Sequence, residues 1–169
     1  MKRIVVLLAS WLVLAGTLAF ARQPDMADIW NGGEINWRDI RSGIYESSNT
    51  GRPVIMVFHA AWCPSCKKYR SVFYDKRIVE ASRDFVMILI DADADKSSNG
   101  AFSPDGTYVP RTIFLNSEGD VQSQFRGAGD PKYPHSIDVD RPDELLSLMQ
   151  KAKDAMRTEP PRQPSVDRT

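Results

Sequence analysis

The sequence predicts a single α/β domain with a central mixed β-sheet flanked by helices. Two short apolar runs of strand length, residues 53–58 and 85–90, are rich in β-branched side chains and are typical of strands buried on both faces of a sheet. Segments with amphipathic, helical spacing precede, separate and follow these runs. The length of 169 residues leaves little room for a second domain.

Local patterns place each element in order. A helical repeat of apolar residues that begins at Trp37 predicts the first helix, and Pro142 fits the first turn of the last one. The turn-rich residues 116–120 separate two short apolar runs and indicate an antiparallel hairpin, whereas the polar residues 96–108 are assigned no helix or strand. The predicted order is helix 36–47, strand 53–58, helix 63–74 with an irregular continuation to about 81, strand 85–90, strands 111–115 and 121–125, loop 127–140 and helix 142–156.

The two ends of the chain are predicted to lie outside this domain, which spans residues 22–157. Residues 1–3 are basic, an apolar run follows to Phe20, and residues 19–21 have the small-x-small pattern of a signal-peptide cleavage site. An uncleaved membrane anchor is the alternative, because about 17 apolar residues is close to the length that spans a bilayer. Residues 1–21 therefore predict export, with a periplasmic or secreted location and no membrane span after cleavage. Residues 158–169 are proline-containing and are predicted to be a disordered tail.

Charge and cysteine content exclude several classes of protein. The chain has 22 basic and 22 acidic residues, and it becomes slightly acidic when Lys2 and Arg3 leave with the signal peptide. Domains that bind nucleic acid usually present a basic face, so no nucleic-acid partner is predicted. Two cysteines are too few for a disulfide-rich scaffold or for a four-cysteine zinc site.

Both cysteines, Cys63 and Cys66, lie in one Cys-Pro-Ser-Cys motif where a predicted strand meets a predicted helix. At the start of a helix, unpaired backbone N–H groups stabilise a thiolate on the first cysteine and lower the thiol pKa. Because the thiolate is the form that attacks disulfides, we expect Cys63 to be the exposed nucleophile and Cys66 the more buried resolving thiol. Trp62 is expected to shield the pair and to offer substrates an apolar platform.

Two other uses of the cysteine pair are weighed against redox chemistry. A structural disulfide is disfavoured, because closing so short a loop restricts the unfolded chain little. A metal site needs further ligands, and the only histidines of the chain are His59 and His135. His59 is expected to be packed or solvent-facing rather than a ligand. No metal and no organic cofactor is therefore predicted, and copper or zinc handling by the two thiolates stays the weakest alternative.

The motif and its surroundings resemble the thioredoxin superfamily. Residues 61–67 follow a strand, and the pair Val109–Pro110 precedes another strand. Residues 54–63 and 102–111 resemble the small secretory-pathway group of thioredoxin domain-containing protein 12 and the anterior gradient proteins, and bacterial exported thioredoxin-like proteins share the general pattern. The resemblance covers roughly residues 37–155 and implies a thioredoxin-like fold.

The resemblance also implies roles for individual residues. Pro110 would be a cis-proline that faces the disulfide, and Trp62, Val109 and Pro110 would contact substrate. Thioredoxins have a buried acid six residues before the first cysteine, which helps to deprotonate the resolving thiol, but Val57 occupies that position here. The absence of a histidine between the cysteines mildly favours a reducing or exchange role.

The sequence thus predicts an exported thiol–disulfide oxidoreductase that reduces or exchanges disulfides in other exported proteins. Because exported proteins meet an oxidising compartment, a reducing partner must supply the electrons. The protein is expected to be a monomer. The alternative from a different class is a client-binding chaperone or adaptor of the same fold, in which the cysteines are incidental or regulatory.

Overall fold

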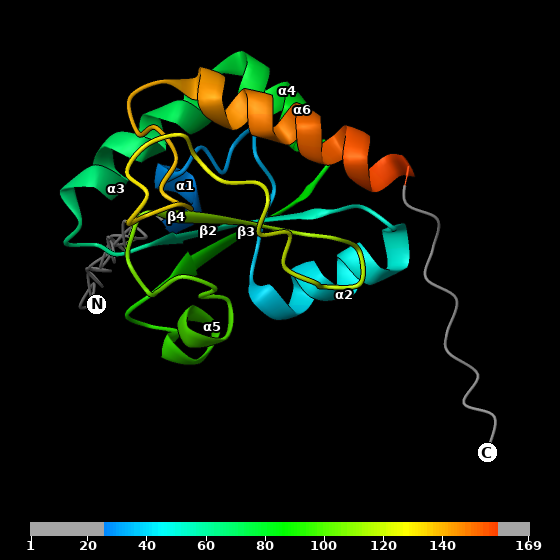
Figure 1. Ribbon diagram of the computed structural model, residues 1–169, viewed down its shortest axis with the longest axis horizontal. Helices are drawn as coiled ribbons and strands as arrows, with labels where there is room; N and C mark the ends of the chain where they lie inside the picture. Colours follow the sequence, from blue (N-terminus) through cyan, green and yellow to red (C-terminus); the bar gives the residue numbers. More distant parts are fainter. Residues whose placement is uncertain (1–25, 159–169) are drawn as a thin grey trace, which may run out of the picture.

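The computed structural model describes residues 26–158 and shows one mixed sheet between two layers of helices (Figure 1). The strand order is β1-β3-β2-β4, in which β1 and β2 both run parallel to β3, and β4 runs antiparallel to β2. The prediction of an α/β fold with a central mixed sheet is confirmed. The strands are β1 (Trp37–Arg38), β2 (Val54–His59), β3 (Val86–Asp91) and β4 (Arg111–Leu115).

Helices cover both faces of the sheet. In Figure 1, α4 and α6 lie above the sheet and α2 and α5 lie below it. The predicted helix 63–74 becomes irregular earlier than expected, because the 3-10 helix η1 already begins at Arg70. The continuation to about residue 81, predicted to be irregular, is instead the regular helix α4. The helices are α1 (Met26–Ile29), α2 (Ile40–Thr50), α3 (Pro64–Tyr69), η1 (Arg70–Tyr74), α4 (Lys76–Ser82), α5 (Lys96–Ala101) and α6 (Pro142–Thr158).

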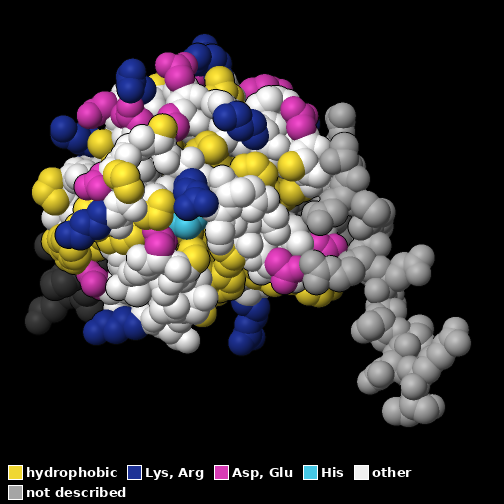
Figure 2. All heavy atoms as spheres, in the orientation of Figure 1, with side chains coloured by type: hydrophobic (Ala, Val, Ile, Leu, Met, Phe, Trp, Pro, Cys, Tyr) yellow, Lys and Arg dark blue, Asp and Glu magenta, His cyan; other side chains and the backbone are white. Residues whose placement is uncertain are grey.

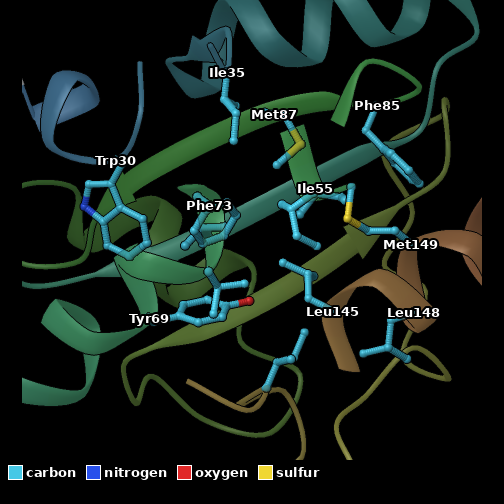
Figure 3. Packing of buried hydrophobic residues seen from close by; sticks show 14 of the residues in the cluster. Trp30, Ile35, Ile55, Tyr69, Phe73, Phe85, Met87, Leu145, Leu148 and Met149 are labelled. Carbon is cyan, nitrogen blue, oxygen red and sulfur yellow. The ribbon is translucent and has the colours of Figure 1, made fainter. Parts of the chain in front are cut away.

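The central strand β2 is buried along its whole length, and its side chains alternate between two apolar clusters. Ile55 belongs to the cluster on one face, together with Trp30, Phe73 and, from α6, Leu145 (Figure 3). Met56 belongs to the cluster on the other face. Because apolar packing fixes β2 from both sides, the turn that follows its last residue is held on a rigid base.

The first helix begins later than the periodicity predicts, and the assignment of Trp37 to it is wrong. Asp39 caps α2, since its carboxylate accepts the backbone N–H of Ser42 at 2.9 Å. Trp37 lies before this cap in β1 and pairs with β3, and its indole Nε1 donates to the carbonyl of Trp30 at 2.6 Å. Strand pairing at the sheet edge therefore prevails over helical spacing at this residue.

Two further predictions are corrected by the structure. Residues 121–125 do not form the second strand of a hairpin; a single bridge joins Leu115 and Val121. The polar stretch contains α5, whose cap is Asp95, with its carboxylate accepting the N–H of Ser98 at 2.9 Å. None of the residues of α5 is buried, so the helix has no apolar face that hydrophobic patterning could detect. Its start is stabilised by the polar cap instead.

Several expectations fall outside what the structure describes. The predicted signal peptide and residues 159–169 lie outside residues 26–158, whereas Thr158 belongs to α6. Within the described residues, no helix is both long enough and apolar enough to cross a membrane. Figure 2 shows acidic and basic side chains interspersed over the face in view, in keeping with their equal numbers in the sequence.

Candidate active site

Cys63 and Cys66 form a disulfide at the start of α3. The turn after β2 is closed by the backbone N–H of Cys63, which donates to the carbonyl of Ala60 at 3.2 Å. Cys63 is the N-cap of the helix, and its Sγ accepts the N–H of Cys66 at 3.0 Å. Pro64 occupies the first turn, where a missing N–H leaves no bond unmade. The same N–H of Cys66 would stabilise a thiolate on Cys63 in the reduced protein.

The expectation that Cys63 is exposed is wrong for the disulfide form. Cys63 is 3% exposed and Cys66 is 2% exposed. The loop before β4 covers the first sulfur, because the carbonyl oxygen of Val109 lies 3.7 Å from the Sγ of Cys63. The Val109–Pro110 peptide bond is cis, as the resemblance implied. The loop before β4 therefore limits access to the first sulfur.

A cleft of about 910 Å³ lies beside the disulfide. The structure brings together on its wall the three residues that were expected to contact substrate, Trp62, Val109 and Pro110. A second part of the lining, which the sequence did not indicate, comes from residues 128–141 and from Glu144 near the start of α6. Its residues are Ala128, Gly129, Asp130, Tyr133, Ser136, Ile137, Asp138, Val139, Arg141 and Glu144.

Trp62 is the most exposed large apolar side chain at the cleft, with 66% of its surface accessible. Its indole Nε1 donates to Oδ2 of Asp93 at 2.7 Å, which fixes the direction of the ring. Asp93 was not predicted as a site residue. Because β2 and β3 are parallel, their carboxyl ends lie next to each other. The position of Asp93 just after β3 could therefore have marked it as a site residue in the sequence.

Arg111 anchors the loop that covers the disulfide. This side chain has no exposed surface, and its guanidinium lies 4.0 Å from the centre of the Phe58 ring. The guanidinium donates to the carbonyl of Tyr108 at 2.8 Å and to the carbonyl and the side-chain oxygen of Asn99 at 3.0 and 2.7 Å. Burial lowers the pKa of Arg111 to about 10. Arg111 thus ties the loop before β4 to α5.

A second set of polar contacts joins the same loop to residues 127–141. The hydroxyl of Tyr108 donates to Asp105 at 2.5 Å and accepts the backbone N–H of His135 at 2.8 Å. Burial, followed by the contact with Asp105, raises the pKa of Tyr108. Nδ1 of His135 lies 2.9 Å from the other carboxylate oxygen of Asp105. The carboxylate of Glu144 accepts the N–H groups of residues 128 and 138, both at 2.6 Å, and fastens this segment to α6.

His59, at the end of β2, is buried, with 2% of its surface exposed. Its ring centre lies 5.2 Å from that of Trp30. Of the two possibilities that the sequence left open for His59, packed or solvent-facing, the structure shows the packed one. Burial lowers the pKa of His59, while Asp91 opposes and Arg70 assists that change. Among residues 26–158, no group of three or more His, Cys, Asp or Glu side chains is placed to hold a metal ion.

Comparison with known proteins identifies relatives over most of the chain. A family profile described as thioredoxin-like matches residues 36–117. Anterior gradient protein 1 of Xenopus laevis is 32% identical over 132 residues, covering 76% of this chain and 69% of the relative. The anterior gradient protein 2 homolog of Homo sapiens is 28% identical over 134 residues, covering 76% and 72%.

Solved structures show the same fold at lower identity. A thioredoxin from Thermus thermophilus is 17% identical and has a TM-score of 0.55, covering 73% of this chain and 90% of that one. The first thioredoxin domain of mouse protein disulfide-isomerase A4 is 17% identical with a TM-score of 0.51, covering 76% and 82%. Residues 127–144, which form one wall of the cleft, lie beyond the part matched by the family profile.

Proposed function

The chain belongs to the anterior gradient group of thioredoxin-like proteins, and from that premise we propose that it is an exported thiol–disulfide oxidoreductase. Its redox centre is the pair Cys63 and Cys66. The proposed substrates are disulfides in other exported proteins, reached in the periplasm or after secretion.

The proposed reaction transfers two electrons from the reduced pair to the client. The thiolate of Cys63 attacks one sulfur of the client disulfide, the client S–S bond breaks, and the departing client sulfur takes up a proton. Cys66 then attacks the Sγ of Cys63, which releases the second client sulfur and closes the Cys63–Cys66 disulfide. The observed disulfide corresponds to the end of this cycle, so a reducing partner must return two electrons before the next turnover.

One observation supports this function above all others: the disulfide lies at the start of a helix, and its first sulfur is 3.7 Å from the Val109 carbonyl on the wall of the large cleft. An extended client segment in the cleft would meet this carbonyl and the exposed face of Trp62. The apolar ring offers contact without requiring one particular client sequence.

Insulin reduction tests the proposal. With dithiothreitol as the terminal reductant, the wild type should accelerate the precipitation of insulin chains, and Cys63→Ser should not exceed the rate without protein. Cys66→Ser should instead accumulate a mixed disulfide through Cys63, since the resolving thiol is missing. Equal rates for the wild type and Cys63→Ser would refute the redox function.

A client-binding adaptor is the second candidate, and the burial of both cysteines beside an open cleft favours it. In that case the cleft acts and the cysteines do not. A fluorescent peptide from a reduced, alkylated client should then bind the Cys63→Ser/Cys66→Ser double variant as tightly as the wild type. Loss of all binding in the double variant would exclude the adaptor function.

A further inference from the structure

The resolution step of the proposed reaction needs a group that takes the proton from Cys66. A thiol attacks a disulfide only after it has become a thiolate, and Cys66 is buried, which disfavours the charged form. Val57, at the position where thioredoxins place an acid, is an aliphatic side chain with no exposed surface. If the proposed function holds, another residue of this chain must therefore take the proton from Cys66.

Cys66 and His59 line the same small cavity, of about 100 Å³, which is separate from the large cleft. Apart from the imidazole, the polar side chains on this cavity are Lys67 and Arg70, which donate protons in hydrogen bonds but offer no acceptor atom. Met26 and Ile29 of α1, and Trp30 directly after it, contribute apolar side chains to the cavity. His59 is thus the only side chain of the cavity, within residues 26–158, that can accept a proton from the thiol.

The imidazole is also in a suitable state to act as a base. Its Nε2 is buried and has no hydrogen-bond partner within the described residues, although buried polar atoms nearly always have one. Burial keeps the ring neutral, with Arg70 of η1 acting in the same direction and Asp91 of β3 opposing it. The cavity is large enough to admit water, because one molecule needs roughly 10–15 Å³.

We propose that His59 is the proton acceptor for Cys66 in the resolution step, either directly or through one water molecule. Nε2 takes the proton from the thiol, and the resulting thiolate attacks the Sγ of Cys63 in the mixed disulfide. The bond between Cys63 and the client breaks, and its electron pair leaves with the client sulfur, which takes a proton from solvent. His59 then returns its proton to solvent.

Single-turnover reaction of the reduced protein with dithionitrobenzoate separates the two steps. Attack by Cys63 releases the first thionitrobenzoate, and resolution by Cys66 releases the second. General bases contribute roughly 10²–10⁴-fold to a rate, so His59→Asn should slow the second release about 10²-fold at neutral pH and leave the first within about twofold. His59→Asp has the same shape as His59→Asn but carries a group that can accept a proton, so it should recover part of the rate of the second release.

Ser47→Ala is the control for the loss of a buried polar contact elsewhere in the fold. Ser47 of α2 is 1% exposed, its hydroxyl donates to the carbonyl of Arg52 at 2.6 Å, and α2 packs on the other face of the sheet. Ser47→Ala should leave the rate and the pH profile of the second release unchanged. A second release in His59→Asn within twofold of the wild type, or slowed equally in Ser47→Ala, would overturn the proposal.

The wild-type pH profile provides a test that needs no variant. If the neutral imidazole is the base, the second release should level off above about pH 6.5, the ordinary pKa of histidine, since burial lowers the pKa of His59 below that value. A rate that instead rises tenfold per pH unit from 6 to 9 would show that the thiol ionises unaided and would refute the role of His59. Failure of insulin reduction with an intact second release would refute the proposed function and leave this inference standing.

Discussion

Replacing Arg111 with methionine tests whether the buried guanidinium stabilises the loop over the disulfide. The substitution keeps an unbranched chain in the core but removes all three hydrogen bonds that tie Tyr108 and Asn99 together. Two opposing free-energy changes then decide the outcome. The charge no longer has to be buried, and the three carbonyl oxygens lose their donor.

Magnitudes decide between these effects. Burial lowers the pKa of Arg111 from 12.5 to about 10, and since each unit of pKa corresponds to about 1.36 kcal/mol, keeping the charge costs the folded state roughly 3 kcal/mol at neutral pH. A hydrogen bond from a charged donor contributes roughly 1.5–3 kcal/mol, so three of them outweigh the cost. The free energy of unfolding should therefore fall by about 1.5–6 kcal/mol in Arg111→Met.

Urea unfolding with the disulfide intact measures this loss. Arg111→Lys is the matched control: it keeps the charge, but one ammonium cannot reach Tyr108 and Asn99 with the geometry of the guanidinium fork, so it should lose at least about 1 kcal/mol. If Arg111→Met is as stable as the wild type or more stable, desolvation outweighs the bonds, as happens for some buried ion pairs, and the anchoring role of Arg111 is refuted.

Three further predictions address other parts of the molecule. A Cβ at Gly43 would lie 2.5 Å from the side chain of Ile88, so Gly43→Ala should lower the free energy of unfolding by about 1–3 kcal/mol. Because Ile88→Ala removes the clashing atoms, the double variant should lose less stability than the two single variants together. Additive losses would contradict the clash. Because burial lowers the pKa of His59, the unfolded chain binds more protons than the folded chain just below pH 6.5. The free energy of unfolding in urea should therefore decrease as the pH is lowered below 6.5, and it should decrease less steeply in His59→Asn. Equal pH dependence in the wild type and the variant would refute this. Glu144→Gln replaces one of the two acceptor oxygens of the carboxylate by an amide donor, so one of its two backbone hydrogen bonds is lost. Amide hydrogen exchange in residues 127–141 should then accelerate about tenfold. Unchanged exchange would show that these bonds do not hold the segment.

The central strands could be predicted because their sequences leave little choice. Residues 54–58 are apolar at every position, and a short strand buried on both faces is the structure that uses such a run. The cysteine motif could be placed because a buried-strand run precedes it and an amphipathic helical pattern follows it. The structure adds that Pro64 occupies the first turn of that helix.

The corrected assignments depend on contacts that sequence patterns do not contain. Trp37 has helical spacing, yet the cap at Asp39 and pairing with β3 place it in a strand. The low exposure of Cys63 comes from Val109, 46 residues further along the chain. The role of His59 as a cavity residue was also hidden, because its significance lies in what it shares a cavity with rather than in its neighbours in sequence.

The site depends on parts of the chain well beyond the cysteine motif. The Val109 carbonyl over the disulfide belongs to a loop that Arg111 ties to α5, and Tyr108 of the same loop accepts a bond from the backbone of His135. Residues 127–141 also form a wall of the cleft and lie outside the region matched by the family profile. Because one segment both lines the cleft and supports the loop over the first sulfur, changes in it should alter client binding and access to the disulfide together. Under the proposed function, the cysteine motif supplies the redox chemistry, and substitutions in residues 127–141 are expected to change which client segments bind.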